Sequence, residues 1–269
     1  MKFYTSIITL LLFNICFANE ITFGVVPQFD HRKIQSIWNP ILQEINSDHG
    51  LKIKLIGSPS IADFEVKFEK GEFDFVYLNP YHLIIANQKQ GYYPILKDTG
   101  RELYGIIVVR KDSSINNIHQ LHQKKIALPS PNALGAALIP RTEFATKYKI
   151  TPTYIYVKSH DSVYLNVLLG KVDAGGGVQK TFNKQPNYIK DKLRIIYETE
   201  HVSPHPIAVH PRVSKEIIKK INDTFYKCFN DEKKRLWLEK IPIKKLGEAN
   251  LLDYQQLKTM GLESFYIRK

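Results

Sequence analysis

Three short turns in the sequence combine helix-capping residues with small or polar side chains, and each follows a segment that reads as a strand. They are Asn79-Pro80, the stretch SPNALG at residues 130–135 and the stretch SHDS at residues 159–162. A turn that opens a helix presents free backbone N–H groups and the positive end of the helix dipole, so the chemistry it offers is anion binding. For any one of these turns taken alone, ordinary helix capping is the favoured explanation. Three of them in one chain indicate a ligand cleft.

Side chains at these turns supply the candidate ligand-binding residues. Tyr77 and Asn79 end the strand that enters the first turn, so both should lie at the carboxyl edge of a sheet, where open α/β sheets bind ligands. His160 in the third turn either donates to an anion or packs beneath the helix start, and the sequence leaves both open. The second turn combines polar donors with small residues that let a ligand approach the backbone. Its candidates are Ser130, Asn132, Gly135 and Ala136.

Motifs for catalysis or metal binding are weak. The stretch HDS at residues 160–162 contains the residue types of a catalytic triad, but neighbours in sequence cannot form the triad geometry. No G-x-S-x-G elbow occurs, and the glycines at 175–177 lack the spacing of a dinucleotide loop. The spacing of His201, His205 and His210 fits no standard zinc pattern. We therefore expect no enzymatic activity, no metal and no other cofactor.

The composition is that of an ordinary globular protein, which excludes the disordered, collagen-like and disulfide-scaffold classes. The chain has 269 residues, of which 43% are hydrophobic and 24% charged, with a formal net charge of +12. Such a surplus attracts anions at long range. The basic residues are scattered through helical segments and no DNA-binding motif occurs, so we expect no nucleic-acid partner.

The N-terminus predicts a secretory signal peptide at residues 1–18. Lys2 precedes a short apolar run, and Ala18 is the small residue expected before a cleavage site. An apolar first strand is the alternative, and lipid attachment at Cys16 fits less well because a bulky residue precedes it. Cleavage takes the formal charge from +12 to +11 and leaves Cys228 as the one thiol, so no internal disulfide is expected. We expect an exported, periplasmic protein.

Strands and helices alternate along the rest of the chain, which predicts an α/β fold with mostly parallel sheets. Apolar residues at helical spacing over residues 34–45 predict a helix that Pro40 kinks or restarts. A second helix is expected over residues 133–148, kinked at Pro140, and the tail from Ser214 onward is expected to be helical. Strands are predicted at residues 21–26, 51–56, 73–77, 103–109, 125–128, 154–157, 172–177 and 193–197.

Several of these stretches resemble phosphonate-type, PhnD-like periplasmic binding proteins of ABC transporters. The stretch WNPIL at residues 38–42 resembles part of the first helix of that family, and DFVYLNP at residues 74–80 also resembles the family. Residues 104–117 look like its crossover strand and following turn, and residues 130–135 occupy the place of its anion loop. The stretch HDS at residues 160–162 matches a further family position. The resemblance covers nearly the whole mature chain, in order.

The resemblance implies a two-lobe α/β fold of the type II binding proteins, in which two crossover strands join the lobes and allow them to close on a solute. Lobe 1 would comprise residues 19–103 and 204–269, and lobe 2 residues 104–203. The implied function is that of the periplasmic substrate-binding component of an ABC importer. Its ligand would be a small oxyanion such as a phosphonate, phosphate or phosphite, or an anionic metabolite. The implied partners are this solute and the membrane permease, and we expect a monomer.

The sequence departs from the family at positions that decide the ligand. Ala133 and Leu134 stand where phosphonate binders carry hydroxyl residues, and Ile61 stands where an aromatic ligand residue is usual. The aminoalkyl-phosphonate binder has an acidic residue for the amino group where this sequence has His205, so such a ligand is not expected. Tyr104 and His205, near the crossovers, are secondary site candidates.

Two other functions fit the same residues. A periplasmic ligand-sensing protein that reports to a membrane signalling partner would use the same fold. A hydrolase or other enzyme acting through the His160 region would lose turnover on His160→Ala, whereas a binding protein would lose affinity and show no turnover.

Overall fold

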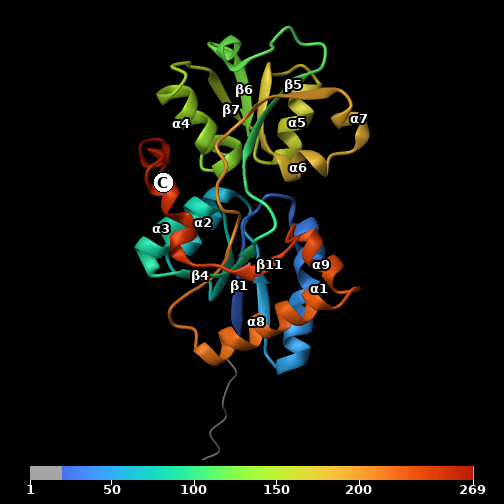
Figure 1. Cartoon of the computed structure of the whole chain (residues 1–269), viewed down its shortest axis with the longest axis vertical. Helices are drawn as coiled ribbons and strands as arrows, with labels where there is room; N and C mark the ends of the chain where they lie inside the picture. Colours follow the sequence, from blue (N-terminus) through green and yellow to red (C-terminus); the bar gives the residue numbers. More distant parts are fainter. Residues whose placement is uncertain (1–19, 269) are drawn as a thin grey trace, which may run out of the picture.

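The computed structural model describes residues 20–268 and divides them between two lobes, each a sheet flanked by helices (Figure 1). Lobe 1, the lower one in Figure 1, has a six-stranded sheet in the order β11-β4-β10-β3-β1-β2. Lobe 2 has a five-stranded sheet in the order β7-β6-β8-β5-β9. The predicted signal peptide, including Cys16, lies outside the described residues.

The strands of lobe 1 are β1 (Ile21–Val25), β2 (Ile53–Ile56), β3 (Phe75–Tyr77), β4 (Tyr93–Asp98), β10 (Ile207–Val209) and β11 (Leu246–Glu248). Its helices are α1 (His31–His49), α2 (Ile61–Glu69), α3 (Pro80–Gln90), α8 (Lys215–Asn230), α9 (Arg235–Lys240) and the 3-10 helices η3 (Leu251–Lys258) and η4 (Leu262–Phe265). The strands of lobe 2 are β5 (Gly105–Arg110), β6 (Lys125–Leu128), β7 (Thr153–Tyr156), β8 (Ala174–Val178) and β9 (Leu193–Glu198). Its helices are α4 (Ile139–Thr146), α5 (His160–Leu168), α6 (Gln179–Asn183), α7 (Asn187–Lys190), the 3-10 helix η1 (Ile118–Leu121) and the π-helical turn η2 (Leu134–Leu138).

Both sheets are mixed, so the prediction of mostly parallel sheets is wrong. β1 runs parallel to β2 and β3, and β6 runs parallel to β7 and β8. The strands next to the lobe crossings are antiparallel: β10 to β3 and β4, and β5 to β8 and β9. The chain crosses between the lobes twice, from β4 to β5 and from β9 to β10. The strand that follows each crossing, β5 or β10, runs against the direction of the βαβ units of its sheet. The two crossings implied by the resemblance are confirmed, and an antiparallel bridge joins them between Leu103 and Val202.

Helix α1 shows how the apolar pattern of the sequence holds lobe 1 together. The predicted face is buried, and Trp38 packs on Phe23 of β1 with ring centroids 5.1 Å apart. Asp30 caps the helix by accepting a hydrogen bond from the backbone N–H of Lys33 at 3.0 Å. The helix continues through Pro40, so the predicted restart does not occur. Pro40 cannot donate a backbone hydrogen bond to the helix. The free energy lost in this way is smaller than the free energy gained by burying the apolar face of α1 on both sides of Pro40.

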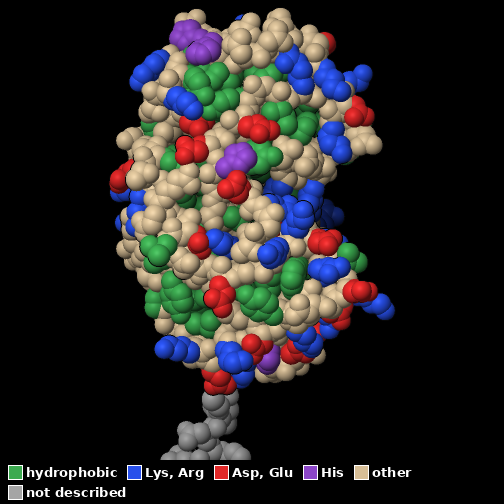
Figure 2. Space-filling model, in the orientation of Figure 1, with side chains coloured by type: hydrophobic (Ala, Val, Ile, Leu, Met, Phe, Trp, Pro, Cys, Tyr) green, Lys and Arg blue, Asp and Glu red, His purple; other side chains and the backbone are tan. Residues whose placement is uncertain are grey.

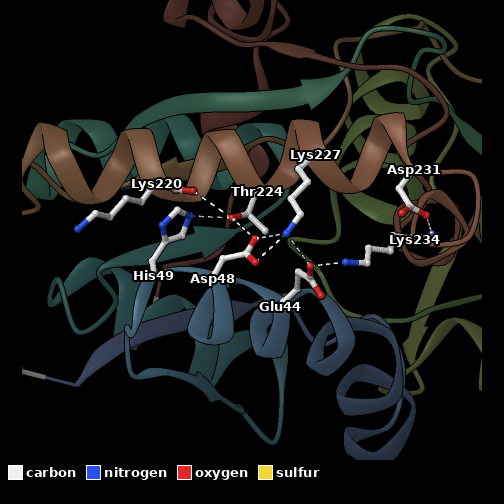
Figure 3. Close-up of polar contacts among 8 residues, drawn as sticks. All are labelled: Glu44, Asp48, His49, Lys220, Thr224, Lys227, Asp231 and Lys234. Atoms are coloured by element: carbon white, nitrogen blue, oxygen red, sulfur yellow. Dashed lines mark hydrogen bonds and ion pairs between the residues drawn. The ribbon is translucent and has the colours of Figure 1, made fainter.

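Helix α8 packs against α1 through both apolar and charged contacts. Its buried side includes Ile221, Phe225 and Cys228, the free thiol. On the rim of this contact, Lys227 lies between the two helices and donates to Asp48 at 2.7 Å (Figure 3). His49 and Thr224 are 3.0 Å apart beside it. The pair of helices therefore closes one face of the lobe 1 sheet.

The tail beyond α9 is not continuously helical, which corrects the prediction for residues after Ser214. β11 adds to the edge of the lobe 1 sheet beside β4, and the chain ends in η3 and η4 near the junction of the lobes (Figure 1). The backbone of Thr99 donates to Lys245 at 2.7 Å where β11 begins. β11 has only three residues, too few to show an alternating strand pattern in the sequence. Its hydrogen-bonding partner is β4, about 150 positions earlier in the chain.

The turn η2 packs directly on the ends of β5 and β8 that lie next to the crossings between the lobes. Glycines in these strands allow the backbone of η2 to come this close. A Cβ on Gly105 would lie 1.7 Å from the carbonyl oxygen of Gly135, and one on Gly176 would lie 2.1 Å from that of Ala136. The helix predicted over residues 133–148 is therefore a π-helical turn followed by α4, and the predicted bend at Pro140 falls where the two meet. These two glycines set the position of the second predicted turn.

We expect Gly105→Ala to destabilise the protein by about 3 kcal/mol, because the obstructing atoms belong to the backbone and cannot swing away. Urea unfolding at neutral pH measures this. Gly57→Ala is the matched control: its Cβ would meet the side chain of exposed His31, which can move, and the expected cost is below about 1 kcal/mol. Equal stability of the two variants would contradict the proposed seating of η2.

Candidate functional site

A small pocket, here termed the interlobe pocket, lies where the three predicted turns meet. Its volume is about 20 Å³, which is enough for roughly one water-sized molecule. Lobe 1 contributes residues that follow β1 and β3 and one residue of the second crossing. Lobe 2 contributes the start of η2, the first residue of α5 and the end of β8. The lining residues are Val26, Gln28, Ile61, Asn79, Ala133, Leu134, Gly135, Ala136, His160, Val178 and His205.

The start of η2 brings unused backbone donors to this pocket. The N–H groups of Leu134, Gly135 and Ala136 have no acceptor in the part of the chain that the structure describes. The first N–H groups of a helix have no partner within it, and they form the positive end of its dipole. All three residues are buried, so water does not satisfy these groups from the outside. This arrangement favours an acceptor with negative charge.

Two histidines face the pocket from opposite sides. His160 Nδ1 is 3.4 Å from the hydroxyl of Thr181, and His205 Nε2 accepts a hydrogen bond from the side chain of Gln28 at 3.2 Å. Burial, with added repulsion from Lys180, lowers the pKa of His160 to about 4. The same two causes lower the pKa of His205 well below its ordinary value. Both imidazoles are therefore neutral at pH 7, and either gains a proton more easily once an anion lies beside it.

The two asparagines of the predicted site connect the lobes. Asn79 caps α3 by accepting from the N–H of His82 at 2.8 Å, and its Nδ2 donates to the carbonyl of Asn132 at 3.3 Å. The side chain of Asn132 donates to Glu65 at 3.2 Å and to the carbonyl of Ile267 at 2.8 Å, and it accepts from the N–H of Ile267 at 2.9 Å. Asn79 lines the pocket, whereas the amide of Asn132 is engaged by lobe 1 and does not.

Three other predicted residues lie in neighbouring cavities. Tyr77 and Tyr104 line a cavity of about 310 Å³ beside the crossings, here termed the hinge cavity. The Tyr77 hydroxyl donates to the carbonyl of Ile241 at 3.4 Å, and Tyr104 stacks on His201 with ring centroids 4.2 Å apart. Ser130 lines a third cavity of about 540 Å³ at the outer mouth between the lobes. The structure therefore brings Asn79, Gly135, Ala136, His160 and His205 together and places the remaining predicted residues around them.

Sequence reasoning missed Gln28 and Val178 in the interlobe pocket and Lys180 in the hinge cavity. Gln28 follows β1, and Val178 ends β8 immediately before Lys180. All three lie near the carboxyl ends of strands, so the rule that selected Tyr77 would also have found them.

The three histidines considered as zinc ligands lie in different surroundings. His201 is 2.9 Å from Glu102 and stacks on Tyr104, His205 lines the interlobe pocket, and His210 packs against Tyr92. Over residues 20–268 the structure shows no cluster of three or more side chains able to hold a metal ion.

Two lobes joined by two crossings, with a buried pocket of backbone N–H groups and histidines between them, are the architecture of two-lobe solute-binding proteins. The sequence matches the family of phosphonate periplasmic substrate-binding proteins of ABC transporters over residues 23–254, and the chain belongs to this family. The predicted family and fold class are thus confirmed. Its members bind a solute outside the cytoplasmic membrane for a membrane-embedded permease. Among the described residues, no helix has the length and apolar character to span a membrane.

Known relatives share little sequence but most of the fold. The phosphonates-binding periplasmic protein of Escherichia coli is 21% identical over 255 residues, which cover 88% of this chain and 75% of that protein. A binding protein component of a phosphonate ABC transporter from Pseudomonas aeruginosa has a TM-score of 0.80 at 16% identity, over 89% of this chain and 84% of the other. PhnD1 from Prochlorococcus marinus, solved with methylphosphonate, also has a TM-score of 0.80 at 16% identity, over 91% and 97% of the two chains.

We expect the stability of the ligand-free protein to fall by about 2 kcal/mol between pH 7 and pH 5 through His160 alone. The unfolded chain binds a proton at this histidine below its ordinary pKa of 6.5, whereas the folded chain does so only near pH 4. Stability from this group is therefore present at neutral pH and is lost as the pH falls. Urea unfolding of His160→Gln across this range should show a flatter profile, with exposed His119→Gln as the control. Equal slopes for wild type and His160→Gln would contradict the buried neutral state.

We expect Asn132→Ala to cost about 1–3 kcal/mol of stability, because it leaves Glu65 and both backbone groups of Ile267 without their partner. Hydrogen–deuterium exchange should also become faster in the C-terminal peptide that contains Ile267. The control is Asn187→Ala, at an exposed position of lobe 2, which should leave exchange in that peptide unchanged. Unaltered exchange in Asn132→Ala would show that the contact does not hold the C-terminus on lobe 2.

Proposed function

We propose that this protein binds a small oxyanion of the phosphonate, phosphate or phosphite kind in the interlobe pocket and delivers it to an ABC permease. The observation that carries the proposal is the meeting of the free N–H groups of η2 with two neutral histidines in a buried pocket. The methylphosphonate bound by the P. marinus relative supports the same class of ligand. We further propose that the protein is exported by cleavage after residue 18 and acts as a monomer, without catalysis.

The oxyanion would be held mainly by the backbone. Ala133 and Leu134 supply no hydroxyl donors, but the N–H groups at the start of η2 remain available, and His160 can donate from its ring. The charge of the anion offsets the desolvation that keeps His160 neutral, so binding and proton uptake favour each other. Affinity should therefore rise as the pH falls below 7.

Entry of the ligand requires the lobes to separate. The pocket has room for roughly one water-sized molecule, and its walls come from both lobes. Rotation about the two crossings would open it, and the outer mouth between α1 and α5 would be the entrance. Lys33 and Asp161 lie 3.8 Å apart across this mouth, so one ion pair breaks on opening.

A thermal-stability screen of the mature protein tests the proposal. Phosphate, phosphite, methylphosphonate, sulfate and small carboxylates should be compared at pH 6 and pH 8. A ligand at 100 times its dissociation constant should add about 2.7 kcal/mol of stability, with a larger effect at pH 6. His160→Ala should weaken binding about tenfold or more, because it removes a charge-assisted hydrogen bond, while His119→Ala should bind as the wild type does.

Two results would count against this function. If none of the anions raises the unfolding temperature, the interlobe pocket is not an oxyanion site. If an anion binds but His160→Ala binds it equally well, the ligand lies elsewhere. Turnover of a ligand that is abolished in His160→Ala would instead indicate an enzyme.

A further inference from the structure

The hinge cavity lies next to the interlobe pocket, and two residues line both spaces. Val178 and His205 line both spaces, and Tyr77 stacks on His205 from the hinge side with ring centroids 5.4 Å apart. The hinge cavity measures about 310 Å³, within the usual range for small-molecule sites, whereas the interlobe pocket measures about 20 Å³. A ligand with its anionic head at η2 therefore has space for an organic tail in the hinge cavity, past His205, where Lys180 lies, as well as toward the outer mouth, whose cavity shares Ile61 with the interlobe pocket.

The walls of the hinge cavity are mostly apolar, and its carboxylates already have partners. Asp98 accepts from Arg101 Nε at 2.6 Å and from three backbone N–H groups, those of Gly100, Lys244 and Lys245. Glu102 lies 2.9 Å from His201. The buried carboxylate of Asp98 is therefore already satisfied by its donors, and Glu102 is largely exposed to solvent beside His201.

Lys180 is the exception among the charged groups of this cavity. Its ammonium group has no hydrogen bond or ion pair with any residue between 20 and 268, and lies 5.9 Å from the centre of the Tyr77 ring. Burial, with repulsion from Lys184 and Arg101, lowers the pKa of Lys180 to about 7. A partly buried amine without a counter-charge gains most from a ligand that supplies one.

The positive charge of Lys180 also acts on the interlobe pocket. Next to burial, it is the largest cause of the lowered pKa of both His160 and His205. The two spaces therefore share one electrostatic environment, in which Lys180, His160 and His205 all become more stable in their charged forms when negative charge enters.

We propose that the hinge cavity holds the tail of the ligand and that Lys180 selects a tail ending in a second acidic group over a neutral or amino-bearing tail. The ligand class is an oxyanion that carries a carboxylate or comparable acid a few bonds from the head, such as a phosphonocarboxylate. This inference rests on the proposed function, because the tail reaches the hinge cavity only if the head lies at η2.

Isothermal titration calorimetry of the mature protein with three ligands of matched size tests the inference. Ethylphosphonate has a neutral tail, phosphonopropionate an acidic one and aminoethylphosphonate a basic one. The wild type should bind phosphonopropionate about tenfold more tightly than ethylphosphonate, and aminoethylphosphonate more weakly than either. Lys180→Met should bind phosphonopropionate and ethylphosphonate with similar affinity, and Lys180→Glu should prefer aminoethylphosphonate.

The control is Lys192→Met, which removes an exposed lysine of lobe 2 that does not line the cavity. It should keep the wild-type ratio of affinities. If ethylphosphonate binds but the wild type shows no preference for the acidic tail, this inference is overturned and the proposed function stands. A preference that survives in Lys180→Met also overturns it. If none of the three ligands binds while phosphate or phosphite stabilises the protein, this inference is overturned and the proposed function stands, whereas both fail if no oxyanion binds.

Discussion

The burial of two neutral histidines between the lobes is the constraint on which the rest of the site depends. His160 and His205 lie in a pocket too small for bulk water, and burial favours their uncharged forms. The closed arrangement is therefore compatible with neutral imidazoles, or with charged ones that have an anion beside them. If the proposed site is correct, closure, proton uptake and anion binding are parts of one equilibrium. The formal net charge of +12 adds long-range attraction for the same kind of ligand. In Figure 2, acidic and basic side chains are interspersed, and Lys and Arg side chains gather at the notch on the right of the molecule.

In the proposed mode of binding, the backbone of η2 supplies the donors that hydroxyl side chains would otherwise supply. η2 reaches its position because Gly105 and Gly176 allow carbonyl groups to lie where a Cβ would stand. Its first N–H groups are thereby held at the junction of the lobes without an internal acceptor. Donors that packing already holds in place lose little conformational entropy when a ligand binds. The site therefore keeps hydrogen-bond donors although Ala133 and Leu134 have no side-chain hydroxyl groups.

The contacts around the pocket tie ligand binding to movement of the lobes. Asn132 of lobe 2 holds the C-terminal segment of lobe 1 through both the N–H and the carbonyl of Ile267. The hinge cavity lies beside the two crossings, which are the segments that must rotate when the lobes open. A ligand tail in that cavity would contact moving parts, so the choice of tail and the ease of closure are physically linked.

Local patterns in the sequence predicted much of this protein, and the tertiary structure decided the rest. The apolar face of α1, the cap at Asn79 and the strand end at Tyr77 depend on residues within a few positions, so they could be predicted from spacing and residue type. The antiparallel strands at the crossings, the strand β11 and the engagement of Asn132 by Ile267, 135 residues away, depend on distant segments meeting in space. The same holds for Lys180, because only packing determines whether a lysine is buried and left without a counter-charge. Periodicity and capping are local, whereas pairing, burial and electrostatic environment belong to the folded chain.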